Sequence, residues 1–124
     1  MNGSERFLVD TNIFIFLVDG NRNVAGFLKD KILFYSFITE IELLGVPGIT
    51  EKQKEIVTEI LKNCIRIGFT DSVCNETIRM KQQSRIKIPD AIIACSAIEN
   101  NLPLITADKG FTQMDNLDCV YFES

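Results

Sequence analysis

The chain of 124 residues contains no histidine and no tryptophan. Without histidine it lacks an imidazole general base, a Ser-His-Asp triad and histidine metal ligands. Cysteine is scarce, and no two cysteines form the C-x-x-C pair of a zinc site. We interpret the cysteines as free, mostly buried thiols in a reducing compartment. They are Cys64, Cys74, Cys95 and Cys119. Catalysis is therefore left to carboxylates, hydroxyls and bound metal.

A long apolar run is also missing. No stretch approaches the roughly 18 consecutive apolar residues of a membrane span. The opening residues, MNGSERFLVD, lack the basic region and long apolar segment of a secretory signal. These absences predict a cytoplasmic protein without a membrane segment. The content of 46% hydrophobic and 24% charged residues is typical of a soluble globular protein, and the length predicts a single domain over residues 1–124.

Basic residues are outnumbered, with 13 Lys and Arg against 17 Asp and Glu and a net charge of −4. This charge balance argues against a protein that binds nucleic acid through a broad basic surface. It is compatible with a nuclease, because carboxylates that hold divalent cations also make a chain acidic. It equally suits a protein partner of opposite charge.

Strand and helix patterns alternate along the chain. Short apolar segments predict strands at residues 7–9, 32–37, 65–69, 103–105 and 119–122. Apolar periodicity and helix-start residues predict helices at 13–18, 24–29, 39–45, 50–64, from 71 onward, and 90–100. Thr50 and Gln53 have the form of a capping box, and Asp71 is expected to cap its helix. Several strands lack polar alternation, so we predict an α/β protein, a three-layer α/β/α fold with a mostly parallel central sheet.

Four acidic residues fall where such a fold gathers its ligands. Asp10 ends the first predicted strand and Asp108 follows the fourth. Glu42 and Asp90 are expected in the first turns of helices. Ligands of parallel α/β folds bind beyond the carboxyl ends of the strands, so we expect these carboxylates along one edge of the sheet.

Crowded carboxylates point to a divalent cation. Two unit charges about 4 Å apart repel by roughly 4 kcal/mol at an effective dielectric of about 20, and a bound cation removes that penalty. Oxygen ligands without histidine or cysteine select Mg²⁺ or Mn²⁺. Such an ion can activate a water molecule and stabilise the charged transition state of phosphodiester cleavage.

Each acidic residue also has a purely structural interpretation. Asp10 could cap the helix after it, and Asp90 could interact favourably with a helix dipole. Thr39 and Glu42 have the spacing of a capping box, and Asp108 could be a turn residue. The functional hypothesis therefore rests on the joint placement of the four residues rather than on any one of them.

Four segments resemble the PIN-domain nucleases, and within them the VapC-like toxins of type II toxin–antitoxin pairs. They are Phe7-Leu8-Val9-Asp10-Thr11-Asn12, the segment 38–45 from Ile38 to Gly45, the segment 88–94 from Ile88 to Ala94, and the segment 102–108 with Phe111. They occur in the order and spacing of that family over nearly the whole chain. The family places its acid three residues after a threonine and before a leucine, which selects Glu42 and not Glu40.

The resemblance implies a PIN-like fold and a Mg²⁺- or Mn²⁺-dependent endoribonuclease that cleaves RNA. On that basis the catalytic residues are Asp10, Glu42, Asp90 and Asp108. Asp10, Asp90 and Asp108 would be metal ligands, while Glu42 would be a further ligand or would position the attacking water. Thr11, Asn12 and Thr106 would orient the carboxylates through hydrogen bonds. The family also implies a homodimer and a small antitoxin protein as partner.

A basic stretch supplies candidate RNA contacts, although its residues could equally form a solvated helix face. These residues are Arg79, Lys81, Arg85, Lys87 and, beside Asp108, Lys109. Two other classes stay open on the sequence. A PIN-like binding module would keep the fold with little catalysis. A signalling receiver domain has similar length and acidity, but it needs an acidic pair after the first strand, where this chain has Asp10 followed by Thr11.

Overall fold

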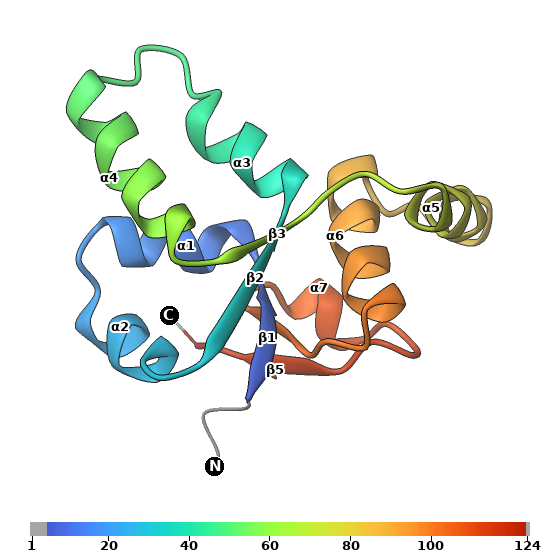
Figure 1. Cartoon of the computed structure of the whole chain (residues 1–124). Coiled ribbons are helices and arrows are strands. Elements are labelled where there is room, and N and C mark those ends of the chain that lie inside the picture. The colour runs from blue at the N-terminus through green and yellow to red at the C-terminus, as the bar shows by residue number, and fades with distance from the viewer. Residues whose placement is uncertain (1–4, 124) are drawn as a thin grey trace.

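The computed structural model describes residues 5–123 and contains a parallel five-stranded sheet of order β3-β2-β1-β4-β5 (Figure 1). Every neighbouring pair of these strands is parallel. The strands are β1 (Arg6–Val9), β2 (Ile32–Ser36), β3 (Ile65–Ile67), β4 (Leu104–Thr106) and β5 (Cys119–Tyr121). The prediction of a mostly parallel sheet is therefore confirmed.

Seven helices in the described residues cover the two faces of this sheet. They are α1 (Thr11–Val18), α2 (Arg22–Leu28), α3 (Phe37–Leu44), α4 (Glu51–Lys62), α5 (Asp71–Gln83), α6 (Ile88–Glu99) and α7 (Lys109–Thr112). Figure 1 shows α1, α2 and α4 on one side of the strands and α5, α6 and α7 on the other. The predicted three-layer α/β/α arrangement is confirmed, and none of the helices described for residues 5–123 is long and apolar enough to cross a bilayer.

The central strands lack polar alternation because both of their faces are buried. Val9 of β1 packs with α1 and α2 in one apolar cluster, whereas its neighbour Leu8 packs with α6 in another. Ile105 and Leu104 of β4 divide between the same two clusters. Successive side chains of a strand point to opposite faces, so two covered faces require apolar residues at every position.

Helix α6 lies deepest among the helices, with seven consecutive residues buried from Ala91 to Ala97. Ala94 and Ala97 let the helix backbone come close to the sheet because their side chains are short. Ser96 is tolerated inside because its hydroxyl donates to the carbonyl of Ile92 at 2.7 Å. This packing fixes the position of Asp90 in the first turn of α6.

Two helix caps differ from the prediction, because other hydroxyls accept the first-turn N–H groups. Ser36 accepts a hydrogen bond from the backbone N–H of Ile38, so α3 begins at Phe37 and Thr39 is an interior residue. Thr70 rather than Asp71 caps α5, accepting from the N–H of Val73 at 3.1 Å. Ser36 both ends β2 and caps α3, which leaves no linking residue between these two elements.

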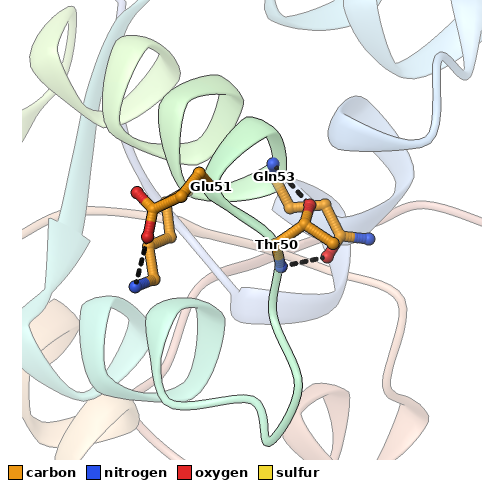
Figure 2. Close-up of polar contacts among 4 residues, drawn as sticks. Thr50, Glu51 and Gln53 are labelled. Atoms are coloured by element: carbon orange, nitrogen blue, oxygen red, sulfur yellow. Dashed lines mark hydrogen bonds and ion pairs between the residues drawn. The ribbon is translucent and has the colours of Figure 1, made fainter.

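The predicted capping box of α4 is confirmed and is drawn in Figure 2. Gln53 donates its backbone N–H to the Thr50 hydroxyl at 3.1 Å, and Thr50 donates its own N–H to Gln53 Oε1 at 2.9 Å. The helix carries Val57 and Leu61 into the core. The adjacent ion pair of Glu51 with Lys54, at 3.2 Å, lies on the exposed side.

The four cysteines are free, as predicted. Cys95 is buried and the other three are half-buried. Burial raises the pKa of the Cys64 thiol to about 11, which keeps it protonated and unreactive at neutral pH.

Candidate active site

Asp10 is the innermost of the four acidic residues, with only 5% of its surface exposed. It follows β1 directly and caps α1, and its Oδ1 accepts the backbone N–H of Thr11 at 2.8 Å. Its Oδ2 accepts the hydroxyl of Thr106 at 2.8 Å. Burial raises the pKa of Asp10 to about 6, the two hydrogen bonds oppose the shift, and the nearby charges of Asp90 and Asp108 add to it.

Thr106 joins two of the acidic residues. It is the last residue of β4 and is fully buried. Its hydroxyl donates to Asp10 and accepts the backbone N–H of Asp108 at 3.0 Å. Asp108 then caps the short helix α7 through an N–H donated by Gly110 at 2.8 Å. The turn interpretation of Asp108 missed this helix, because four residues are too few to show helical periodicity.

Glu42 is held from the side by Thr11. It is exposed in the second half of α3, and the acidic residue of the first turn is Glu40, so the placement of Glu42 in a first turn was wrong. The capping-box interpretation of Thr39 and Glu42 fails for the same reason. The hydroxyl of Thr11 donates to Glu42 Oε1 at 2.7 Å. Glu40 instead pairs with Arg66 at 3.1 Å on the surface.

Thr39 completes a chain of hydroxyls behind Glu42. Its Oγ1 lies 2.9 Å from the Oγ1 of Thr11, and it is fully buried. Thr11 has a single hydroxyl proton, which it gives to Glu42, so Thr39 donates to Thr11. Sequence reasoning took Thr39 for a cap and missed this role. Its signal was a threonine three residues before an acid inside a helical segment.

Asp90 lies near enough to the other three acidic residues to interact with their charges. Its pKa is raised first by burial and then by the charges of Asp108 and Glu42, while Lys87 opposes the rise. Asp90 also raises the pKa of Asp10. Asp10 thus interacts electrostatically with Asp90 and Asp108, and Asp90 also with Glu42, while Asp10 and Thr106 lie at the carboxyl ends of adjacent strands.

The carboxylates are gathered loosely rather than in a closed ligand shell. Within residues 5–123, no three Asp, Glu, His or Cys side chains come close enough together to hold a metal ion. Hydrogen bonds to Thr11, Thr106 and Gly110 hold individual carboxylate oxygens, and like charges repel. The donor chemistry, oxygen atoms alone, suits a hard divalent cation.

A groove opens beside this group between α5, α6 and α7. Its volume is about 720 Å³, and both Asp90 and Asp108 line it. Figure 1 shows α5 and α7 near α6, on the same side of the strands. The groove therefore includes two of the four carboxylates together with residues of all three helices.

The predicted RNA-binding residues and Asn12 differ in their contacts and in their exposure. Arg79 lines the groove and pairs with Glu76 at 3.0 Å. Lys81 donates to the carbonyl of Ile86 at 2.8 Å, which fixes the connection after α5. Lys87 is near enough to Asp90 to affect its pKa. Arg85, Lys109 and Asn12 are exposed, and α5 ends at Gln83, so Arg85 and Lys87 do not continue that helix.

Similarity to known proteins identifies the family of this chain. A model of the PIN domain matches residues 7–117. The chain belongs to the PIN-domain family. This membership removes the receiver-domain alternative. A search of curated proteins returned no match.

Solved structures of other proteins share this fold. This PIN domain is similar to a chain of a toxin–antitoxin complex from Klebsiella pneumoniae, with 28% identity, a TM-score of 0.78, and coverage of 92% of this chain and 95% of that chain. It is also similar to a chain of VapBC-1 from nontypeable Haemophilus influenzae, with 26% identity, a TM-score of 0.75, and coverage of 94% and 97%. A chain of VapBC2 from Rickettsia felis, whose structure contains a DNA fragment from the promoter, shares the fold at 21% identity and a TM-score of 0.80, over 95% and 99%.

Proposed function

We propose that this PIN domain is a Mg²⁺- or Mn²⁺-dependent endoribonuclease and the toxin of a toxin–antitoxin pair. The observation that carries the proposal is the electrostatic coupling of Asp10 with Asp90 and Asp108 at the carboxyl edge of the sheet. Asp10 and Asp108 also cap helices, but neighbouring like charges repel, and a bound cation would stabilise them together. The similarity to chains of toxin–antitoxin complexes supports the toxin role.

Asp10, Asp90 and Asp108 are the proposed metal ligands. When bound, the ion would lower the pKa of a water molecule and neutralise charge that develops on the phosphate. Thr106 orients both Asp10 and Asp108 through one hydroxyl. Oriented ligands bind a metal more tightly because fewer side-chain conformations are lost on binding.

Glu42 is proposed to position the attacking water or to add a ligand. Thr11 holds its Oε1, which leaves the other oxygen to accept a hydrogen bond from water. Thr39 fixes the Thr11 hydroxyl in the orientation that donates to Glu42. Asn12, an exposed residue in the first turn of α1, is a further proposed orienting residue.

The candidate RNA contacts are unequal. Lys87 lies near Asp90 and is proposed to reach the phosphate backbone beside the carboxylates. Arg79 is paired with Glu76, and its side chain is 64% exposed, so it is proposed to contact RNA from the surface. Arg85 and Lys109 are exposed and free to approach RNA from solution. Lys81 is proposed to act indirectly, by holding the connection between α5 and α6.

A homodimer and a small antitoxin are proposed partners in the cytoplasm. Several large apolar side chains are exposed and available for such contacts. Ile41, Phe69 and Ile88 are 61%, 60% and 57% exposed. The acidic group also suits an antitoxin that inserts an arginine or lysine between the carboxylates.

The direct test is RNA cleavage by the purified protein with Mg²⁺ or Mn²⁺ and with EDTA. We expect cleavage only with the metal, and its loss in Asp10→Asn. Asp19→Asn is the matched control, because Asp19 is exposed at the other end of the same helix. Absence of cleavage in wild type freed from any co-purified protein, or equal cleavage by Asp10→Asn, would overturn the proposal.

A further inference from the structure

The residues that line the groove could contact parts of an RNA other than its phosphate backbone. Apolar contact comes from Met80, Met114 and Phe111. The two α6 residues that line it, Asp90 and Ile98, are separated by about 12 Å along the helix axis at about 1.5 Å per residue. A volume of about 720 Å³ is within the range of small-ligand pockets.

Side-chain amides are concentrated in the groove. Gln83 ends α5, Gln113 follows α7, and Asn116 lies in the next turn, and all three line the cavity. Each amide offers both donors and an acceptor. That combination matches the edges of nucleobases, which also present donors and acceptors side by side.

The charges of the groove disfavour a second phosphate. Besides Asp90 and Asp108, the acidic residues Glu76 and Asp115 line it. Arg79 is the single cation among its described lining residues, and Glu76 already pairs with it at 3.0 Å. A phosphate placed deep in this groove would meet net negative charge, whereas an uncharged base would not.

We infer that the groove binds one unstacked nucleobase of the RNA, next to the phosphate that is cleaved. The inference rests on the proposed nuclease function, since Asp90 and Asp108 belong to both the groove and the carboxylate group. The amides read the edge of the base, and the methionine side chains contact its flat face. The enzyme therefore selects its cleavage site partly by the identity of that one base.

The experiment measures cleavage of short single-stranded RNAs in which each position around one cleavage site is varied to all four bases. The variants are Gln83→Ala and Gln113→Ala, alone and together. Gln82→Ala is the matched control, because Gln82 is exposed on the same helical turn and does not line the groove. Asn116 is left unchanged, since its φ of 66° would strain an alanine.

We expect wild type to prefer particular bases at one position next to the cleaved bond. Each glutamine variant should reduce that preference about fivefold, the value of one lost hydrogen bond, and leave preferences elsewhere unchanged. Gln82→Ala should keep the wild-type preference. Metal-induced thermal stabilisation should be equal in all four variants, because none of these glutamines is a proposed ligand.

The results distinguish a failure of the base subsite from a failure of the proposed nuclease function. If wild type cleaves RNA without base preference, or if the glutamine variants keep the wild-type preference, the base subsite is wrong and the nuclease stands. If wild type cleaves no RNA with either metal, the proposed function is wrong, and the base subsite that depends on it is wrong as well.

Discussion

The hydroxyl of Thr106 donates to Asp10 Oδ2 at 2.8 Å and links the ends of two adjacent strands whose residues are 96 positions apart. The same oxygen accepts the N–H of Asp108. A single buried side chain thus orients two of the proposed metal ligands.

Replacing Thr106 by valine keeps the shape of the side chain and removes both hydrogen bonds. The N–H of Asp108 and one oxygen of Asp10 lose their partner, so we expect stability to fall by about 1–3 kcal/mol. Apparent Mg²⁺ affinity should fall about tenfold or more. Thermal melts with increasing Mg²⁺ measure both effects. Thr106→Ser should restore them, and wild-type metal affinity in Thr106→Val would contradict the orienting role.

Asp10→Asn should change how the stability of the metal-free protein depends on pH. The pKa of Asp10 is about 6 in the folded chain against an ordinary value of 3.8, so the folded state binds more protons between these values. Wild type therefore loses stability as pH rises through this window, and asparagine, which does not titrate, does not. Between pH 5 and pH 8 the difference amounts to about 1.4 kcal/mol in favour of the variant.

The asparagine can keep both contacts of Asp10. Its Oδ1 can accept the N–H of Thr11, and its amide can donate to Thr106 instead of accepting from it. Urea unfolding in EDTA at several pH values measures the predicted change. A variant that is less stable than wild type by the same amount at every pH would count against the buried charge.

Glu42→Gln and Glu40→Gln separate a functional acid from a structural one on the same helix. We expect Glu42→Gln to lower kcat for RNA by about 100-fold or more, since a neutral amide is a weak base and a weak ligand. Glu40→Gln removes only an exposed ion pair with Arg66, so kcat should stay unchanged and stability should change by less than about 1 kcal/mol. Equal kcat in the two variants would refute the role of Glu42.

Thr39→Val tests the hydroxyl chain behind Glu42. Without the Thr39 proton, Thr11 is free to turn its own proton away from Glu42. We expect kcat to fall about tenfold with little change in KM, and Thr39→Ser to restore it. Thr77→Val is the control, because Thr77 is a buried helical threonine whose hydroxyl donates to the carbonyl of Val73 at 2.7 Å. A similar loss of kcat in both variants would point to a general packing defect.

Asp90→Asn should relieve repulsion among the carboxylates. The pKa of Asp90 is raised by burial, and next by Asp108 and Glu42, so a neutral side chain is favourable without metal. We expect a higher Tm than wild type in EDTA and a smaller rise on adding Mg²⁺. Lower stability in EDTA would show that the Asp90 charge supports the fold instead.

Local sequence signals predicted most elements and all four acids of the candidate site. Fully apolar segments indicated buried parallel strands, and the Thr50–Gln53 capping box started α4 where predicted. The start of α3 could not be predicted, because Ser36, a strand residue, is also its cap. Helix α7 was missed because a helix of four residues has no detectable period.

The sequence by itself determined the chemistry available to this protein. With no histidine and with acids after two predicted strands, it allowed carboxylate and metal chemistry at the carboxyl edge of a parallel sheet. Only the tertiary structure decided which hydroxyls hold those acids. Thr11 bonds to Glu42, 31 residues away, and Thr106 to Asp10, because adjacent parallel strands bring distant segments together. Such contacts have no local signature, since they depend on how strands pair and not on neighbours along the chain.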